Sequence, residues 1–339
     1  MPTALLTAPA TRAPLVIAHR GAPGHRPEHT LAGYELAARM GADYLEPDLV
    51  STADGVLVAR HEPMIGGTTD VAAHPEFADR RTVRTIDGFT VEDWFADDFT
   101  LAELRTLRAV ERLPLLRQGN TVYDGLFPVP TFDEILDLRA RLSVELGREI
   151  GVYPETKSPT YFAARGLACE PALVAALRAH GLDRADSPVF VQSFETANLR
   201  ALHEEIPVQL VQLLDDVGAP ADLVAAGDPR TFADLVRPAE LAGIAEYAAA
   251  IGPAKELVIP PDGEPTTLVA DAHAAGLLVH AYTFRNENSF LPTGMRRTDR
   301  EADHGDVLAE YRAFHAAGVD GVFSDYPDTA VAAFSLVPA

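Results

Sequence analysis

Residues 43–50 read Asp43-Tyr-Leu-Glu46-Pro-Asp48-Leu-Val50, a short apolar stretch with two carboxylates near its carboxyl end. Residues two apart on a β-strand point to the same face, so Glu46 and Asp48 are expected side by side. Short apolar runs of this kind recur along the chain and alternate with Ala/Leu-rich segments of helical period, in about eight units. The expected strands are residues 15–19, 43–50, 150–155, 189–194, 208–213, 257–260, 277–284 and 321–324.

The segments between these strands predict helices, which makes the chain an α/β protein with a parallel sheet. The expected helices are residues 30–40, 131–146, 171–180, 231–250, 267–275, 307–316 and 328–334. A closed (β/α)8 TIM barrel and an open doubly wound sheet would both give this alternation. Only a barrel gathers residues from many strand ends at one point. The polar residues near the ends of the predicted strands, His19, Glu46, Asp48, Glu155, Gln192, Tyr282 and Asp325, therefore favour the barrel.

One stretch, residues 62–128, breaks the alternation after the second strand and is much longer than an ordinary connection of about 2–6 residues. It contains a capped helix pattern beginning at Thr100. Its aromatic residues are Phe77, Phe89, Trp94, Phe95, Phe99 and Phe127. We expect an inserted cap subdomain at residues 62–128, a barrel formed by 14–61 and 129–336, and an N-terminal tail at 1–13. The cap is expected to shape the substrate site; the alternative is a peripheral packing module.

Composition restricts the partners and the compartment. The formal charge of −22 argues against a general nucleic-acid surface, which needs a basic stripe. No apolar run approaches the roughly 20 residues of a membrane span, and the first residues lack the pattern of a signal peptide. The single cysteine, Cys169, excludes an intrachain disulfide. The predicted location is cytoplasmic, or periplasmic or secreted if a leader has been removed, and the sequence leaves the oligomeric state open.

Three carboxylates, Glu46, Asp48 and Glu155, are expected to meet at the barrel mouth. Such groups repel one another and resist joint ionisation unless a cation neutralises them. Oxygen ligands without cysteine favour calcium, magnesium or manganese over zinc or copper. The sequence therefore predicts one divalent cation. The alternative is a set of surface charges.

Two histidines, His19 and His61, flank this acidic segment, and Arg20 follows the first of them. Two imidazoles, a guanidinium and paired carboxylates indicate acid–base chemistry on a phosphate. Sequence patterns of serine hydrolases, dinucleotide-binding domains, P-loop proteins and zincins are missing from the chain.

These residues resemble the signature of the glycerophosphodiester phosphodiesterases. The similarity is carried by His19-Arg20-Gly21-Ala22, Pro27-Glu28-His29-Thr30, Gly41-Ala42-Asp43-Tyr44-Leu45-Glu46-x-Asp48, Asp54-Gly55-x-x-Val58, His61 and Tyr153-Pro154-Glu155-Thr156-Lys157. It continues through Asp98-Phe99-Thr100-Leu101, Gln192-Ser193-Phe194, Val279-His280-x-Tyr282-Thr283 and Ser324-Asp325-Tyr326-Pro327-Asp328. Within the family, the chain is most similar to bacterial members with a long insertion, which are typically secreted and calcium-dependent.

The resemblance implies a role for each matching residue. Glu46, Asp48 and Glu155 would hold the metal, for which Ca²⁺ is expected and Mg²⁺ or Mn²⁺ are the alternatives. His19 and His61 would act as general base and acid, Arg20 and Lys157 would bind the phosphate, and Glu28 would orient Arg20 or a histidine. Gln192, His280 and Tyr282 would line the substrate, although His280 is equally explained as a barrel-interior histidine.

The predicted reaction is metal-dependent hydrolysis of glycerophosphodiesters, such as glycerophosphocholine and glycerophosphoethanolamine, to glycerol 3-phosphate and the free alcohol. A hydroxyl lies next to the ester in such substrates, so we expect a cyclic phosphate that water then opens. Two alternatives remain. One is a related phosphodiesterase acting on a lysophospholipid or a glycerol-phosphate polymer, and the other is a catalytically weak ligand-binding barrel.

Overall fold

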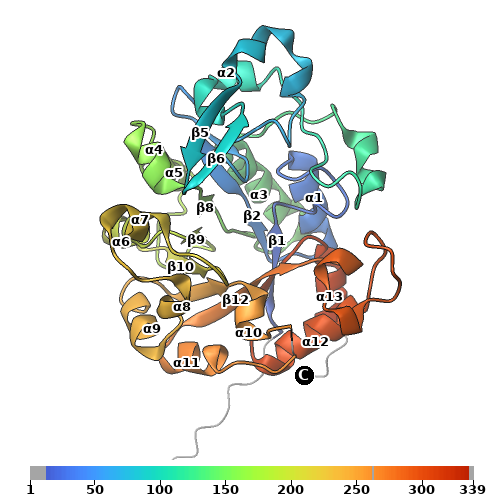
Figure 1. The fold of residues 1–339 in the computed structure, drawn as a ribbon, viewed down its shortest axis with the longest axis vertical. Helices are drawn as coiled ribbons and strands as arrows, with labels where there is room; N and C mark the ends of the chain where they lie inside the picture. Colours follow the sequence, from blue (N-terminus) through green and yellow to red (C-terminus); the bar gives the residue numbers. More distant parts are fainter. Residues whose placement is uncertain (1–12, 262, 336–339) are drawn as a thin grey trace, which may run out of the picture.

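The computed structural model describes residues 13–261 and 263–335, which form a closed ring of eight parallel strand positions surrounded by helices (Figure 1). The ring closes because β13 pairs in parallel with β1, with Gly321 opposite Leu15. The eight positions in chain order are β1 (Leu15–His19), β2 with β3 (Tyr44–Glu46 and Asp48–Ser51), β7 with β8 (Gly151–Val152 and Glu155–Thr156), β9 (Phe190–Ser193), β10 (Gln209–Leu214), β11 (Ala250–Pro253), β12 (Leu278–Phe284) and β13 (Gly321–Ser324). The predicted (β/α)8 TIM barrel is confirmed.

Prolines interrupt the second and third positions of the ring. Before Pro47, β2 pairs with β1 and β7, and after it β3 pairs with β8. Proline cannot donate to the ladder, but its carbonyl can still accept. The Pro47 carbonyl accepts from Glu155 N at 2.9 Å, and the Pro154 carbonyl accepts from Gln192 N at 2.9 Å. Pairing therefore continues past both prolines and places Asp48 directly opposite Glu155.

An additional strand, β4 (Leu57–Ala59), was not predicted. It runs antiparallel to β3, with Leu49 opposite Ala59, so the chain turns back on the second barrel strand. His61 follows β4, and the backbone N–H of Arg60 donates to the Asp48 carbonyl at 3.0 Å, which brings His61 back beside Asp48. His61 therefore reaches the mouth from the return strand rather than from the carboxyl end of a barrel strand.

The predicted sixth strand is wrong. Residues 255–258 form the short helix α10 (Lys255–Val258), and the sixth strand is β11 (Ala250–Pro253), which begins at the last residue of the helix predicted over 231–250. Alanine is a strong helix former, so Ala248-Ala-Ala250 favours helix, but β10 and β12 pair with Ala250 and Ile251 on both sides. The predicted helix is also divided, into α8 (Phe232–Leu235) and α9 (Pro238–Ile244), at Pro238.

The remaining helices surround the barrel (Figure 1). They are α1 (Leu31–Met40), α3 (Phe132–Leu146), α4 (Pro159–Ala164), α5 (Glu170–Ala179), α6 (Thr196–Glu205), α7 (Ala221–Ala226), α11 (Leu268–Ala274), α12 (Val307–Ala317) and α13 (Pro327–Ser335). The six other predicted helices correspond to α1, α3, α5, α11, α12 and α13, and α6 was missed. Thr131 begins α3 with a capping box to Glu134. The predicted tail at 1–13 lies outside the described residues except for Ala13.

Residues 62–128, which we call the inserted segment, carry mostly short elements. These are the 3₁₀ turns Val71–Ala73, Pro75–Arg80, Ala96–Asp98 and Gln118–Tyr123, the hairpin β5 (Thr82–Ile86) with β6 (Phe89–Asp93), and the helix α2 (Leu101–Leu104), whose capping box at Thr100 was predicted. Phe77 and Phe99 are buried in the same hydrophobic core as the barrel helices, whereas Phe89 is 74% exposed. The boundaries of the segment as a separate subdomain remain a prediction.

Aromatic and aliphatic side chains fill the barrel interior. Ile17, Tyr153, Phe190 and Phe323 form one buried cluster, and His280 lies against it, 5.2 Å from the Phe190 ring. Because this packed layer fills the interior, polar chemistry belongs at the mouth. Among the described residues, none of the helices is both long enough and apolar enough to cross a membrane.

Candidate active site

Three carboxylates meet where the second and third barrel strands end. Glu46 closes β2, Asp48 opens β3, and Glu155 opens β8 opposite Asp48. One oxygen of each lies within 4.8 Å of one oxygen of the others, and all three residues are buried. The strand register alone brings these groups together, as the sequence predicted.

Burial makes these charges costly without a cation. Burial, with Asp48 and Glu155 nearby, raises the pKa of Glu46 well above its ordinary value. Burial also raises the pKa of Glu155 to about 8, against the opposing effect of Lys157. Asp48 is also buried, but Lys157, His61 and His29 hold its pKa well below the usual range. The cluster is therefore short of positive charge in the protein alone.

The donor set fits a hard divalent cation. Asp48 Oδ1 is buried and has no hydrogen-bond partner, while its other oxygen, Oδ2, accepts from His29 at 2.9 Å. An unsatisfied buried carboxylate oxygen is costly unless something binds it. Glu46 is held by the Arg20 backbone N–H at 2.7 Å and by Gln192 Nε2 at 3.1 Å. These contacts fix the orientation of Asp48 and Glu46, and three carboxylates form a donor set that suits calcium, magnesium or manganese.

His19 ends β1 beside this cluster. Its Nδ1 lies 2.6 Å from Asp325 Oδ1, a contact that places the proton on Nδ1 and leaves Nε2 as the free base. Burial, with Arg20 nearby, lowers the pKa of His19 to about 4. The imidazole is therefore neutral at pH 7 and able to accept a proton.

His61 has a matching carboxylate partner. Its Nδ1 lies 2.5 Å from Glu62 Oε1, so Glu62 makes the orienting contact. Burial, followed by Arg20 and Lys157, lowers the pKa of His61 to about 3. A bound phosphodiester anion would offset those two cations and raise the pKa of His61 again.

Arg20 and Lys157 supply positive charge on either side of Asp48. Arg20 Nη1 donates to Glu28 Oε2 at 3.3 Å, as predicted for the orienting glutamate, and Arg20 Nε lies 3.3 Å from Asp48 Oδ2. Lys157 Nζ lies 2.7 Å from Glu155 Oε1 and 4.0 Å from Asp48 Oδ1. Both cations are almost fully buried, which strengthens their field at the mouth.

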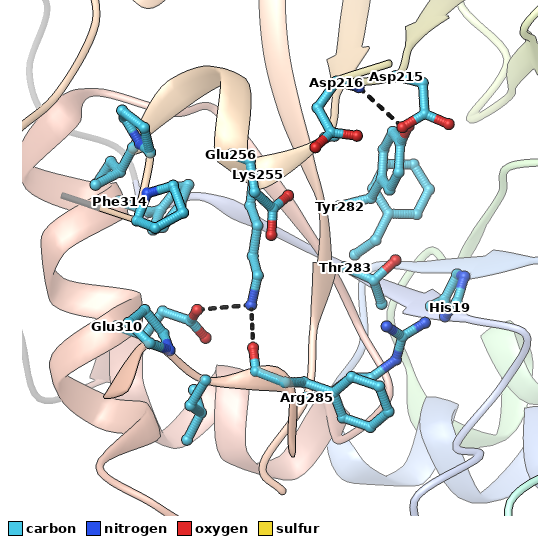
Figure 2. Close-up of a pocket in the computed structure, with 18 of the residues that line it drawn as sticks. His19, Asp215, Asp216, Lys255, Glu256, Tyr282, Thr283, Arg285, Glu310 and Phe314 are labelled. Atoms are coloured by element: carbon cyan, nitrogen blue, oxygen red, sulfur yellow. Dashed lines mark hydrogen bonds and ion pairs between the residues drawn. The ribbon is translucent and has the colours of Figure 1, made fainter. Parts of the chain in front are cut away.

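A cavity of about 760 Å³ opens at this point. Its wall includes seven of the residues singled out from the sequence: His19, Arg20, Glu46, His61, Glu155, Gln192 and Tyr282. Asp48 and Lys157 are not part of this wall. Figure 2 shows the part of the wall that reaches from His19 past Tyr282 to Asp215, Asp216 and Lys255. His280 is not part of the wall. Its Nδ1 bonds the Tyr153 hydroxyl at 2.8 Å inside the barrel, which matches the barrel-interior interpretation.

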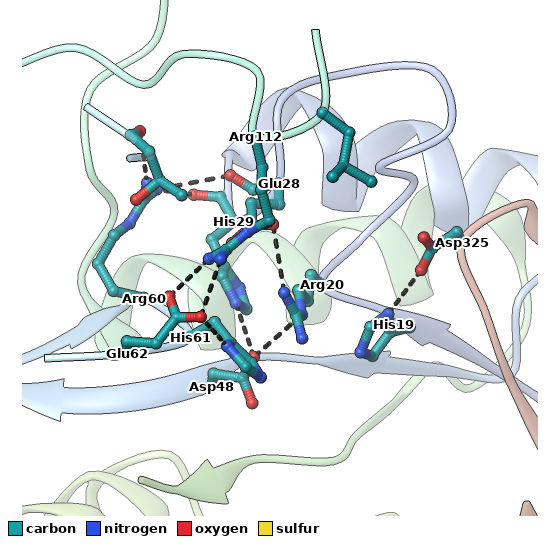
Figure 3. A network of polar contacts seen from close by, with 12 residues as sticks. His19, Arg20, Glu28, His29, Asp48, Arg60, His61, Glu62, Arg112 and Asp325 are labelled. Atoms are coloured by element: carbon teal, nitrogen blue, oxygen red, sulfur yellow. Dashed lines mark hydrogen bonds and ion pairs between the residues drawn. The ribbon is translucent and has the colours of Figure 1, made fainter. Parts of the chain in front are cut away.

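Sequence reasoning missed several residues that hold the site (Figure 3). His29 stands in a family motif but had no predicted role in the site, and it is fully buried between Asp48 and the Tyr34 hydroxyl. Asp325 was noted at a strand end without a role. Arg112 and Arg117 stand in the inserted segment in no recognisable motif. Among these four residues, His29 and Asp325 offered a signal, because both stand in motifs of the family resemblance and Asp325 also lies at the end of a predicted strand.

A parallel barrel with carboxylate, imidazole and positively charged side chains at the carboxyl ends of its strands defines a TIM-barrel enzyme. The chain matches the model of the glycerophosphoryl diester phosphodiesterase family over residues 19–329. It belongs to that family and is a phosphoric diester hydrolase.

Relatives cover nearly all of the chain. It is 35% identical to glycerophosphodiester phosphodiesterase GDPD6 of Arabidopsis thaliana, over 93% of this chain and 84% of the relative. It is 30% identical to the glycerophosphodiester phosphodiesterase of Haemophilus influenzae, over 94% and 88%. An Oleispira antarctica phosphodiesterase, solved with the product sn-glycerol-3-phosphate, has the same fold, with a TM-score of 0.61 and 22% identity over 95% of this chain and 97% of that one.

Proposed function

We propose that the protein hydrolyses glycerophosphodiesters with small alcohol head groups, such as glycerophosphocholine and glycerophosphoethanolamine, in a reaction that depends on a divalent cation. The products would be glycerol 3-phosphate and the free alcohol. One observation carries the proposal: Glu46 and Glu155, which cluster with the buried Asp48, lie in the same cavity wall as His19 and His61. A cation, two proton-transfer groups and a phosphate-sized positive site are what phosphodiester cleavage requires.

Glu46, Asp48 and Glu155 would hold the cation, and Ca²⁺ is the proposed ion. When bound, it would supply charge stabilisation for the phosphate oxygens. Arg20 and Lys157 would bind the same phosphate, and Glu28 would keep the Arg20 guanidinium facing it. The site would thus offset charge that builds up on the phosphate during the reaction.

His19 would act as the base through Nε2. It would take the proton of the glycerol hydroxyl next to the ester, and that oxygen would form the new bond to phosphorus. His61 would donate a proton to the alcohol oxygen as its bond to phosphorus breaks. In the second half of the reaction, His61 would take a proton from water, water oxygen would bond to phosphorus, and His19 would return its proton to the glycerol oxygen. The intermediate is a glycerol cyclic phosphate.

Release of glycerol 3-phosphate from glycerophosphocholine tests the proposal. Activity should disappear with a chelator, return with Ca²⁺, and fall by roughly 10²–10⁴ in His19→Ala and His61→Ala. His180→Ala, at a histidine outside the cavity wall, should behave as wild type. Full activity in the chelated protein would contradict the metal requirement, and binding without turnover would favour a ligand-binding barrel.

The cyclic intermediate has its own test. During turnover, ³¹P NMR should show a five-membered cyclic phosphate that precedes glycerol 3-phosphate. Glycerol cyclic phosphate supplied directly should be hydrolysed by the wild type. If it is neither formed nor consumed, water attacks phosphorus directly and the base role of His19 must be reassigned.

Lysophospholipid is a second candidate substrate, because a second hollow adjoins the first. It has a volume of about 910 Å³ and shares Glu155, Phe194 and Asp215 with the catalytic cavity. Its wall includes the exposed side chains of Phe89 and Val217, to which an acyl chain could bind. If lysophosphatidylcholine is a substrate, Phe89→Ser and Val217→Ser should weaken its turnover and leave glycerophosphocholine turnover unchanged. This result would support lysophospholipid as the second substrate.

A further inference from the structure

The inserted segment sends two arginines toward the barrel mouth, and each contacts the carboxylate behind one histidine. Arg117 is buried, with Nη2 2.5 Å from Asp325 Oδ2 and Nε 2.6 Å from Glu287 Oε1. The other oxygen of Asp325 is the partner of His19 Nδ1. A continuous chain of contacts therefore runs from the inserted segment through Asp325 to His19.

Arg112 makes the corresponding connection to His61 (Figure 3). Its Nη1 and Nη2 donate to the two oxygens of Glu62 at 2.8 and 2.7 Å, and its Nε and Nη2 donate to the two oxygens of Glu28 at 2.7 and 2.8 Å. Glu62 holds His61, and Glu28 holds Arg20. Bidentate pairing at two carboxylates fixes both in plane and orientation.

Neither arginine belongs to the wall of the catalytic cavity. Any effect they have on the reaction must therefore pass through the carboxylates. Such carboxylates set the tautomer and the direction of a histidine ring, which decides whether Nε2 faces the reacting atoms. Arg117 and Arg285 also hold the pKa of Asp325 well below its ordinary value against the effect of burial, so the carboxylate stays charged beside His19.

We propose that Arg112 and Arg117 are positioning residues, through which the inserted segment orients both histidines of the reaction. The proposal rests on the proposed roles of His19 and His61. It gives the inserted segment a task in the reaction: Arg117 acts on the base through Asp325, and Arg112 acts on the acid through Glu62 and on the phosphate site through Glu28.

The first test compares two leaving groups in the calcium-loaded full chain. Glycerophosphocholine needs a proton on the departing alcohol, whereas 4-nitrophenolate departs from glycerophospho-4-nitrophenol without one. Both esters share the later attack of water, in which His61 is the proposed base, so the comparison uses the single-turnover rate of alcohol release. Arg112→Met should lower this rate for glycerophosphocholine by about 10- to 100-fold and for the nitrophenyl ester by at least several-fold less. Arg117→Met should lower kcat for both esters by similar factors of about 10 to 100, since both need the base.

Arg84→Met is the matched control. Arg84 also lies in the inserted segment and pairs with two carboxylates, Asp97 and Asp98, but neither contacts a histidine. This variant should keep the wild-type kcat for both esters. Arg112→Lys and Arg117→Lys should recover part of the lost kcat, because lysine keeps the charge but cannot make both sets of contacts.

Double variants separate positioning from general destabilisation. If Arg117 acts through Asp325, Arg117→Met should cause no further loss of kcat in an Asp325→Asn background. In the same way, Arg112→Met should cause little further loss of kcat for glycerophosphocholine in a Glu62→Gln background. Any further loss there should be only the part that Arg112 exerts through Glu28. Losses that multiply in both pairs, or wild-type kcat in both single variants, would overturn the proposal. An inactive wild type would instead overturn the proposed function, so the two failures are distinguishable.

Discussion

His29 illustrates how one side chain can determine the state of another that bears the chemistry. It has no access to solvent, bonds Asp48 Oδ2 through Nε2 and the Tyr34 hydroxyl through Nδ1, and so fixes which Asp48 oxygen faces the other carboxylates. A partner of this kind typically contributes 10–100-fold to metal affinity.

We therefore expect His29→Gln to weaken Ca²⁺ binding by about 10-fold or more. Tyr34→Phe, which removes only the outer contact, should cost less. Calorimetric titration of each folded variant with Ca²⁺ would measure this. An unchanged affinity in His29→Gln would show that Asp48 keeps its orientation through Arg20 and Lys157 alone.

Most of the site residues that were predictable stand on a strand end or directly beside one in sequence, whereas Glu28 was identified from the family motif. Glu46, Asp48 and Glu155 could be placed because strand periodicity fixes their direction. Arg112 and Arg117 could not, because they reach the mouth from an inserted segment whose path follows tertiary packing rather than any local period. A motif identifies the groups that react, whereas the groups that orient them depend on the fold.

At the scale of elements, the turn between β1 and α1 carries the heaviest steric constraint near the site. Gly21 has φ +95°, and a Cβ there would lie 2.9 Å from the Gly33 carbonyl carbon. The turn also presents the Arg20 backbone N–H to Glu46. Glycine is therefore required both for the backbone conformation and for the close approach of α1.

Gly21→Ala should lower the free energy of unfolding by roughly 1–3 kcal/mol or more. Gly55→Ala is a control with a similar φ of +77° and open space around the added carbon. It should show only the smaller cost of the backbone conformation. Urea denaturation of both variants would measure the difference, and equal losses would mean that α1 shifts to accommodate the methyl group.

Strand prediction failed where local propensity and tertiary pairing disagree. Ala248-Ala-Ala250 favours helix, yet Ala250 and Ile251 pair with β10 and β12 in the sixth strand. The second strand was easier to predict, because residues 43–50 form a short apolar stretch with two carboxylates near its carboxyl end. Its continuation into β4 was missed because a three-residue return strand has too short a pattern to detect.

At the scale of the whole molecule, a buried acidic cluster couples stability to pH and to the cation. The pKa of Glu155 is about 8 in the folded protein and ordinarily 4.5, so without a cation the folded state holds a proton that the unfolded state loses. A raised carboxyl pKa gives stability that is present below pH 4.5 and lost as pH rises toward 8. His19 and His61 act in the opposite direction, since their lowered pKa values cost stability only as pH falls below 6.5.

The effects of the carboxyls and of the histidines on stability separate above pH 6.5. There the histidines are neutral in both the folded and the unfolded state, and the buried carboxyls still differ in protonation between the two states. The chelated protein should therefore lose stability between pH 6.5 and 8, at up to about 1.4 kcal/mol per pH unit for one proton. Ca²⁺ should remove this slope, because it replaces the proton and adds binding energy to the folded state. Denaturant unfolding at both pH values, with chelator and with Ca²⁺, would measure it. Glu155→Gln removes one titrating carboxyl and should reduce the chelated slope, while Glu46, whose pKa burial also raises, keeps part of it. A slope equal to that of the wild type would show that Glu155 does not carry the coupling.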